Sequence, residues 1–267
     1  FWDDKKNLFI TAPTSSGKTL LAFLPMLHLS ENGNYPRILY VVPYRALAYQ
    51  KEKELKKFLP DDLCDDVVVS TGEVLDNDQD IRSGYARIAV VIYEKVFLFQ
   101  VMNSNFLDLY DLIILDEFGI VNNEERGIKA DFVFYNVVNK KIRCIILTTP
   151  FYNWKIYQNC SDFYIIKNEN RPVPLVEIIY SKYTQQGKSA PIGYHRIKGE
   201  NEDIITIQNS AVKRIDLICQ ICAEHYKLGH TILIFINNRE EIRNFIAKIY
   251  DYSGRNLIAL YLFLSML

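Results

Sequence analysis

The stretch APTSSGKT, at positions 12–19, decides the fold of the N-terminal part of the chain. It follows the apolar run LFI at 8–10, which predicts a short strand, and it leads into a helical pattern over 18–29. A strand, a tight loop and a helix in that order aim backbone N–H groups at one point, where phosphate oxygens bind. The pattern G-x-x-x-x-G-K-[ST] fails here only at its first position, which is Ala12. We therefore expect a phosphate-binding loop, rather than a helix-capping turn without a ligand.

Three residues of this loop are expected to have separate roles in binding phosphate. Gly17 lets the backbone come close to a ligand, because it has no Cβ. Lys18 places a positive charge near the outer phosphates, and Thr19 offers a hydroxyl to Mg²⁺. The residues expected to contact the nucleotide are Thr14, Ser15, Ser16, Gly17, Lys18 and Thr19.

Continuous apolar runs separated by helical segments indicate the fold class. After the first strand, further strands are expected at 37–43, 67–70, 86–93, 112–117 and 143–149. These runs do not alternate with polar residues, so both faces of each strand should be buried. We therefore predict an α/β fold in which helices cover both faces of a parallel sheet.

Changes of pattern along the chain predict its domain organisation. Prolines and polar residues interrupt the apolar runs from 168 to 210, which indicates a connector with short strands. A helix over 211–229, a buried strand over 231–236 and a further helix then begin a second α/β unit. The expected domains are 1–167, which binds the nucleotide, the connector 168–210, and an incomplete second domain 211–267.

Composition limits the class of protein. The chain has 267 residues, 49% of them hydrophobic, and a formal net charge of −1, so it can build a core but carries no overall basic signal for nucleic acid. Five scattered cysteines are typical of a reduced intracellular protein, cytoplasmic or nuclear, and Cys219 and Cys222 are expected to face the core.

The apolar run at 256–267 is too short to span a membrane, so no membrane partner is expected. We expect the chain to be a fragment, since it starts without methionine and ends in this uncovered run.

Two adjacent carboxylates mark the end of the apolar strand over 112–117. In a parallel α/β sheet, ligands bind beyond the carboxyl ends of the strands. Asp116 is then placed to hold Mg²⁺, and Glu117 to orient and deprotonate an attacking water. The alternative is a solvated turn. Together with the loop, these residues favour a hydrolase of nucleoside triphosphates, with ATP and Mg²⁺ as cofactors, over a kinase.

At this point the sequence resembles the superfamily 2 helicases, in particular the DExH-box branch of archaeal repair helicases and exosome-associated RNA helicases. In that superfamily, alanine commonly replaces the first glycine of the loop. The stretches that carry the resemblance, in family order, are APTSSGKT at 12–19, PYRALAYQ at 43–50, STGE at 70–73, YEK at 93–95, DEFG at 116–119, LTTP at 147–150, RPVPL at 171–175 and ILIFINNREE at 232–241.

The resemblance implies a motor of two RecA-like domains that binds ATP in the cleft between them. It places Lys18 and Thr19 on the phosphates and Mg²⁺, Asp116 on Mg²⁺, and Glu117 as the catalytic base. The residues it places on nucleic acid are Arg45, Thr71, Gly72, Glu94 and Lys95. The implied partners are DNA or RNA and the remainder of the second motor domain. A fragment without the family's arginine finger is expected to hydrolyse ATP poorly.

Three positions depart from the family pattern. Gly119 stands where histidine is usual, Ile92 where threonine is usual, and Thr148-Thr149-Pro150 where Ser-Ala-Thr is usual. In the family these positions link ATP hydrolysis to movement of nucleic acid. Two functions therefore stay open: an ATP-driven translocase or helicase, and an ATP-gated nucleic-acid-binding module with weakened or lost coupling.

Overall fold

A computed structural model of the chain describes residues 6–31, 36–72, 77–151, 153–171, 179–183, 193–198, 214–227, 229–236 and 239–253. The chain divides into two compact units, Phe1–Pro174 and Leu175–Leu267, and each is described by itself. The RPVPL segment beyond Arg171, Glu73 and the apolar run at 256–267 lie outside the described residues.

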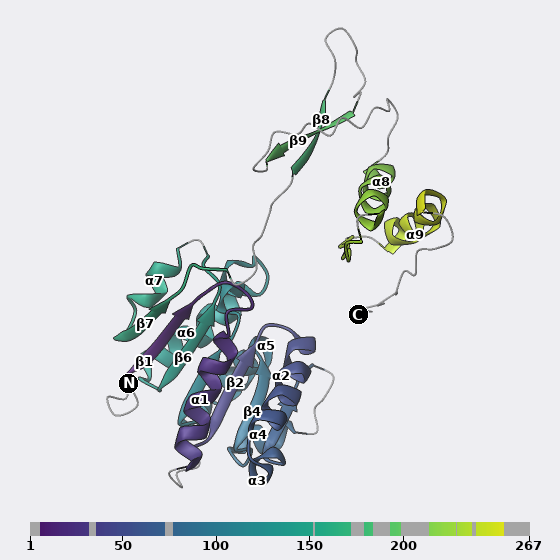
Figure 1. Cartoon of the computed structure of the whole chain (residues 1–267). Helices are drawn as coiled ribbons and strands as arrows, with labels where there is room; N and C mark the ends of the chain where they lie inside the picture. Colours follow the sequence, from purple (N-terminus) through teal and green to yellow (C-terminus); the bar gives the residue numbers. More distant parts are fainter. Residues whose placement is uncertain are drawn as a thin grey trace. The chain divides into compact units, whose positions relative to one another are not determined.

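The first unit is built on one seven-stranded sheet (Figure 1). The strand order is β3-β4-β2-β5-β6-β1-β7, and every neighbouring pair is parallel. The strands are β1 (Asn7–Thr11), β2 (Ile38–Val42), β3 (Val67–Ser70), β4 (Ile88–Ile92), β5 (Leu112–Leu115), β6 (Cys144–Thr148) and β7 (Phe163–Lys167). All carboxyl ends therefore lie at one edge of the sheet, where ligands of such sheets bind.

Helices cover both faces of this sheet, as the apolar runs predict. One face packs against α1 (Lys18–Glu31), α2 (Arg45–Phe58) and α3 (Asp61–Cys64). The helical segments on the other face are α4 (Asp78–Ser83), α5 (Tyr93–Met102), η1 (Phe106–Leu109), η2 (Phe118–Asn122), α6 (Gly127–Asn139) and α7 (Trp154–Gln158). The parallel sheet covered on both sides is thereby confirmed.

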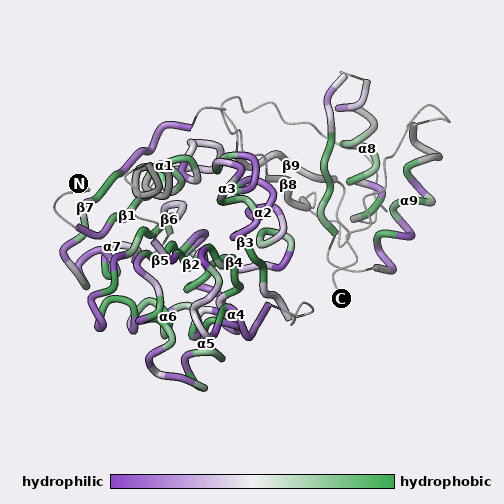
Figure 2. Tube along the Cα trace, turned by 90° about the horizontal axis from the view of Figure 1, so that it is seen from below, coloured by the Kyte–Doolittle hydropathy of each residue, from purple (hydrophilic) through white to green (hydrophobic). Residues whose placement is uncertain are grey.

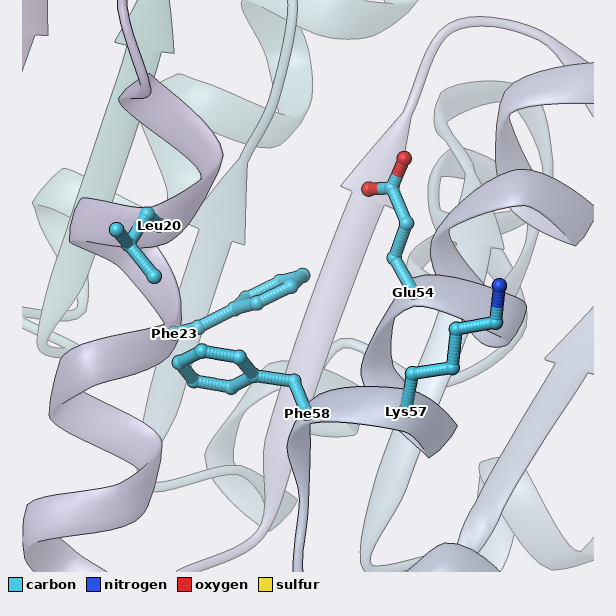
Figure 3. Close-up of a pocket in the computed structure, with 5 residues that line it drawn as sticks. All are labelled: Leu20, Phe23, Glu54, Lys57 and Phe58. Carbon is cyan, nitrogen blue, oxygen red and sulfur yellow. The ribbon is translucent and has the colours of Figure 1, made fainter.

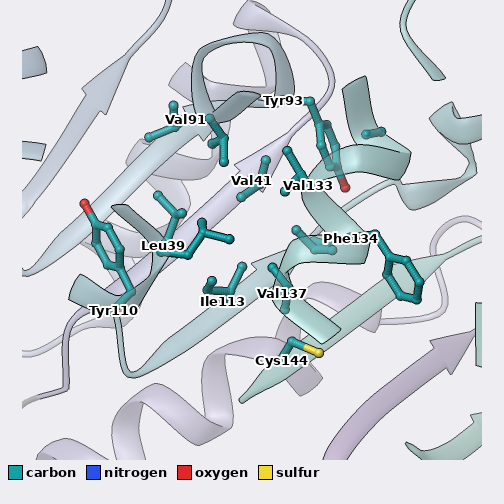
Figure 4. Packing of buried hydrophobic residues seen from close by; sticks show 14 of the residues in the cluster. Leu39, Val41, Val91, Tyr93, Tyr110, Ile113, Val133, Phe134, Val137 and Cys144 are labelled. Atoms are coloured by element: carbon teal, nitrogen blue, oxygen red, sulfur yellow. The ribbon is translucent and has the colours of Figure 1, made fainter. Parts of the chain in front are cut away.

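The hydrophobic core forms two layers, one on each face of the sheet. Leu39, Val41 and Ile113 point into the layer beneath α5 and α6, where they meet Val133 and Phe134 (Figure 4). Hydrophilic residues are gathered instead on the outer surface, for example along α2 (Figure 2). Because the central strands are buried at every position, their sequences are apolar apart from the hydroxyl of Tyr40 in β2.

The expected strands agree with the observed ones to within two residues at each end, but the sequence did not predict β7. Within the described part of the chain, this strand lies at the edge of the sheet and has β1 as its single neighbour. Only Phe163 of its five residues is buried, so the continuous apolar signal of the central strands is weaker there. Among the described residues, no helix is long and apolar enough to cross a membrane.

The second unit contains a hairpin and two helices in its described part. The strands β8 (Ile179–Tyr183) and β9 (Gly193–Lys198) pair antiparallel, within the region predicted as a connector with short strands. The helices α8 (Arg214–Lys227) and α9 (Arg239–Ser253) pack around Cys219 and Cys222, which are buried as expected. None of the five cysteines, all of which the structure describes, forms a disulfide.

The buried strand expected over 231–236 is not found. No hydrogen-bonded strand is assigned to this segment within the described residues, and Leu233 and Phe235 are 78% and 85% exposed. Ile232, Ile234 and Ile236 pack against the helices, so the segment is apolar on both sides but covered on one. Because a strand needs a neighbouring strand for its backbone hydrogen bonds, the apolar run alone does not make one.

Candidate active site

The loop after β1 holds its backbone in an unusual conformation. Ser15 and Gly17 both have positive φ, at 63° and 81°. Such left-handed residues turn successive N–H groups toward one side and form a concavity suited to anions. A Cβ at Gly17 would meet nothing within 4 Å, so glycine is needed there for its backbone angle rather than for space.

Lys18 closes this loop from the start of α1. Its Nζ donates hydrogen bonds to the carbonyl oxygens of Ala12, at 2.7 Å, and Pro13, at 2.9 Å. Burial lowers the pKa of Lys18, and the nearby carboxylates of Glu117 and Asp116 oppose this shift. The charge of Lys18 therefore lies over the loop and faces the end of β5.

Asp116 is fixed at the end of β5 by several buried groups. It is 3% exposed, and its Oδ2 accepts a hydrogen bond of 2.8 Å from the hydroxyl of Tyr40 on β2. Its Oδ1 accepts one from the backbone N–H of Glu117, and its carbonyl oxygen accepts one from the hydroxyl of Tyr93. Burial raises the pKa of both tyrosines, and the charge of Asp116 raises it further, so both remain neutral donors.

Glu117 follows in a strained conformation. Its φ of 47° lies in the left-handed region, which is uncommon for residues other than glycine and is often found at functional sites. Burial raises the pKa of its carboxyl, the charge of Asp116 raises it further, and Lys18 and Lys51 lower it. A carboxyl with a raised pKa, held at a sheet edge next to a phosphate loop, is suited to accept a proton.

Lys51 is a member of this site that the sequence did not predict. Its Nζ donates hydrogen bonds to the Oγ1 of Thr19, at 2.8 Å, and to the Oε2 of Glu54, at 3.0 Å. The same atom lies 3.6 Å from the Oδ2 of Asp116. Lysines of an amphipathic helix usually lie on its solvated face, but Lys51 is only 7% exposed. We call Lys18, Thr19, Lys51, Asp116 and Glu117 the β1–β5 cluster.

A shallow, open apolar pocket of about 290 Å³ lies next to this cluster, between α1 and α2 (Figure 3). Phe23 and Phe58 lie side by side in its lining, with ring centroids 5.2 Å apart. Glu54 lies on its wall and is also a partner of Lys51. Burial acts to raise the pKa of Glu54, but hydrogen bonds from Gln50 and Lys51 outweigh it and lower that pKa.

The β1–β5 cluster fits ATP and Mg²⁺ on two observations. The Oγ of Ser16 is buried in the loop and has no hydrogen-bond partner among the described residues, as expected of a group whose partner is a ligand oxygen. The ammonium of Lys51 touches both Thr19 and Asp116, so a single cation can reach both predicted metal ligands. Mg²⁺ commonly uses one or two protein ligands and completes its shell with phosphate oxygens and water.

The predicted nucleic-acid residues lie at the same edge of the sheet, beyond β2, β3 and β4. Arg45, exposed, begins α2, and a Cβ at Gly72 would lie 2.7 Å from its Nη2. The glycine thus leaves room for the guanidinium against the loop after β3. Thr71 is buried, whereas Arg45 and Gly72 are exposed at this loop.

Lys95 is held inside the protein rather than presented at the surface. It is 7% exposed and forms an ion pair with Asp78, the first residue of α4. Asp78 also accepts a hydrogen bond of 2.5 Å from the hydroxyl of Ser70 at the end of β3. This geometry gives Lys95 a positioning role that joins β3, α4 and α5.

Glu94 is also engaged with a residue of the protein. Its Oε1 lies 3.4 Å from the Nε of Arg126, which precedes α6. Arg126 also donates a hydrogen bond of 3.3 Å to the carbonyl oxygen of Pro43, and its guanidinium lies 5.2 Å from the ring centroid of Tyr44. Arg126 thereby ties Glu94 to the segment that leads into Arg45. We call Arg45, Gly72, Asp78, Glu94, Lys95 and Arg126 the β2–β4 cluster.

The three departures from the family pattern are adjacent to these clusters. A Cβ at Gly119 would lie 3.6 Å from the Oγ1 of Thr148 and 4.0 Å from the Oγ1 of Thr149. The hydroxyl of Thr148 donates instead to the carbonyl oxygen of Thr149, at 2.8 Å. The side chain of Ile92 is 7% exposed and belongs to the core layer beneath α1 and α2.

Comparison with known proteins identifies the family. The model of the DEAD/DEAH box helicases matches residues 2–153, more than half of the chain. The chain belongs to this helicase family. The predicted resemblance to superfamily 2 helicases is thereby confirmed, and its phosphate loop and Asp116-Glu117 pair lie within the matched residues.

Relatives within the helicase family match nearly all of the chain. Putative helicase 7 of Sulfolobus islandicus filamentous virus is 26% identical over 96% of this chain and 38% of its own length. ATP-dependent DNA helicase Hel308 of Methanocella arvoryzae is 24% identical over 92% of this chain and 31% of its own length. The chain thus spans less than two fifths of these relatives.

A solved helicase structure has a similar fold. The crystal structure described as the DUF1998 helicase MrfA bound to DNA has a TM-score of 0.63 to this chain at 16% identity. The similar region comprises 94% of this chain and 33% of the MrfA chain. The agreement supports the RecA-like arrangement of the sheet.

The sequence contains signals for the residues that its motifs missed. Ala48, Lys51 and Leu55 share one helical face, and a lysine on a buried stripe requires a partner. Tyr40 lies in the middle of the otherwise apolar strand β2, so its hydroxyl also requires one. Arg126 has no comparable signal, because its partners, Glu94 of α5 and Pro43 after β2, are distant from it in the sequence.

Proposed function

We propose that the protein is the N-terminal motor portion of an ATP-dependent helicase or translocase that hydrolyses ATP with Mg²⁺ and moves along or unwinds nucleic acid. The observation that carries this proposal is the β1–β5 cluster. A phosphate loop, a buried aspartate and a strained glutamate with a raised pKa meet at the carboxyl edge of one parallel sheet. Membership of the helicase family supports the nucleic-acid half of the proposal.

In this proposal the residues of the chain have distinct roles. The loop N–H groups and Lys18 hold the phosphates, and Lys18 leaves its two carbonyl partners to do so. Thr19 and Asp116 hold Mg²⁺, which supplies charge stabilisation for the phosphates. Glu117 orients the attacking water and accepts its proton. Tyr40 keeps Asp116 in place, because it donates to Oδ2.

Nucleic acid is proposed to lie along the β2–β4 cluster and to be held by its backbone. Arg45 and the N–H groups near Gly72 are suited to phosphate oxygens, which gives a grip independent of sequence. DNA is the first polymer to test, because similar relatives are named ATP-dependent DNA helicases. RNA stays an alternative, and so does a contribution from the second motor domain.

A second candidate function is an ATP-gated clamp with weakened coupling between the two clusters. The observation that favours it is the contact between Gly119 and the end of β6. A side chain at position 119 would lie against Thr148 and Thr149, but glycine offers them no polar group. A change at the nucleotide would then be passed on less effectively to the strands that bind nucleic acid.

Nucleotide binding tests the β1–β5 cluster directly. The complete protein is titrated with a fluorescent ADP analogue in the presence of Mg²⁺, together with Lys18→Ala and Asp116→Asn. We expect both variants to bind at least about tenfold more weakly, because each removes one charge from the site. Binding that is unchanged in both variants would rule out this nucleotide site. Strand separation assays on DNA and RNA then distinguish the motor from the clamp.

A further inference from the structure

Lys51 occupies the position between the two predicted metal ligands, although no motif points to it. Its ammonium donates to the Oγ1 of Thr19 at 2.8 Å and lies 3.6 Å from the Oδ2 of Asp116. Its side chain is 8% exposed and that of Asp116 is 5% exposed. One positive charge therefore satisfies a buried carboxylate and a hydroxyl at the point where Mg²⁺ is proposed to bind.

We propose that Lys51 is a built-in counter-cation of the magnesium site, which holds Thr19 and Asp116 in place before nucleotide binds and withdraws to Glu54 when Mg²⁺·ATP arrives. The inference rests on the proposed function. The reason is electrostatic. The Lys51 ammonium and Mg²⁺ would repel each other strongly if both contacted Thr19 and Asp116 in a buried site. The ammonium must leave before both ligands can contact Mg²⁺.

Glu54 provides an alternative ion-pair partner for the ammonium of Lys51. Its Oε2 already accepts a hydrogen bond of 3.0 Å from Lys51, and it lies one turn further along α2. Glu54 is partly exposed and lines the apolar pocket between α1 and α2 (Figure 3). A change of rotamer in Lys51 therefore keeps one ion pair while it releases the other.

This arrangement has two consequences for the nucleotide-free protein. Asp116 is never left as a buried, unpaired carboxylate, which would destabilise the fold. The positively charged ammonium of Lys51 also holds Thr19 and Asp116 close to the positions that they would take as ligands of Mg²⁺. The cost falls on Mg²⁺, which must displace the ammonium, so Lys51 sets the concentration of Mg²⁺ at which the site fills.

The test compares binding of a fluorescent ADP analogue with and without Mg²⁺ in the full chain. For each variant, the ratio of the dissociation constant in EDTA to that in saturating Mg²⁺ measures how much the metal contributes. In Lys51→Met, we expect this ratio to rise about tenfold above wild type, because one opposing charged contact is removed. Lys53→Met, which removes an exposed lysine from the same helix, should leave the ratio unchanged.

Glu54→Gln provides a test of opposite sign. Without its alternative partner, the ammonium should stay on Thr19 and Asp116, so the ratio should fall below the wild-type value. The nucleotide-free Lys51→Met protein should also melt at a lower temperature than wild type, and Lys51→Arg should recover most of the loss. If Lys51→Met does not fold, Lys51→Gln replaces it in the binding experiment.

The outcomes separate this inference from the proposed function. A ratio that is equal or smaller in Lys51→Met, with normal Mg²⁺ dependence in wild type, overturns the role of Lys51 and leaves the nucleotide site standing. Wild-type binding that ignores Mg²⁺, or that Lys18→Ala leaves intact, overturns the nucleotide site itself. A raised ratio in Lys51→Met and a lowered one in Glu54→Gln support the counter-cation.

Discussion

The β1–β5 cluster and the β2–β4 cluster lie on the same edge of one sheet but hold their charged residues in different ways. In the first, Lys18 and Asp116 bond to groups that a ligand can replace or share, namely loop carbonyls, a tyrosine and another lysine. In the second, Lys95 and Glu94 form ion pairs with Asp78 and Arg126. The first is therefore prepared for a ligand, whereas much of the second maintains the fold.

The largest effect should come from Glu117→Gln, which tests the chemical role of the β1–β5 cluster. Loss of the proposed base should lower ATP hydrolysis by about 10³-fold, because general base catalysis contributes on that scale. Nucleotide affinity should stay close to wild type. Steady-state hydrolysis and ADP binding, measured on the same preparation, check this. Hydrolysis within a few-fold of wild type would exclude Glu117 as the base.

Lys95→Met tests whether the β2–β4 cluster is structural. The substitution leaves Asp78 without its cation, so the free energy of unfolding should fall by about 3 kcal/mol. Chemical denaturation measures this. A cycle with Asp78→Asn and the double variant isolates the pair, and the double variant should recover part of the loss. A stable Lys95→Met protein with weakened nucleic-acid binding would instead support the direct contact predicted from the sequence.

Arg45→Ala should have a smaller effect, and on binding rather than on stability. If Arg45 holds one phosphate, its loss weakens nucleic-acid binding uniformly across sequences and lowers the salt slope by about 1. Stability should change by no more than about 0.5 kcal/mol, as is usual for exposed residues. Binding titrations at several salt concentrations check both values. An unchanged salt slope would remove Arg45 from the proposed track.

The smallest effect is expected from Gly119→His, which tests the link between the two clusters. A side chain there meets Thr148 and Thr149 at ordinary contact distance, so the variant should fold normally. If Gly119 weakens coupling, histidine should increase the stimulation of ATP hydrolysis by nucleic acid several-fold, and basal hydrolysis should not change. Gly119→Ala, which adds bulk without a polar group, is the matched control. If nucleic acid stimulates ATP hydrolysis equally in wild type, Gly119→His and Gly119→Ala, then Gly119 does not weaken the coupling.

The two clusters also differ in how far the sequence predicts them. The places of the loop at 12–19 and of Asp116 at the sheet edge could be predicted because each directly follows a buried strand, while their ligands stay a prediction. Lys95 follows a strand in the same way, but its ion pair with Asp78 depends on α4, a helix that no motif marks. Lys51 was missed for a similar reason, since a lysine-rich helix hides the one lysine that is turned inward.

Two further segments show that a local sequence pattern does not predict strand pairing. The central strands were predicted because both of their faces are buried, which leaves a continuous apolar run. The edge strand β7 lacks that run, and the segment over 231–236 has it but pairs with no strand among the residues that the structure describes. Local pattern thus predicts burial, while pairing depends on residues elsewhere in the chain.

Hydrolysis of ATP by the complete protein, with and without single-stranded DNA or RNA, tests the central claim most directly. Lys18→Ala serves as the blank. A motor that couples the two clusters should hydrolyse ATP faster with one of the polymers, and the blank should show no activity. A flat response, with ATP and the polymer both bound, would contradict the motor and leave the clamp as the function of this chain.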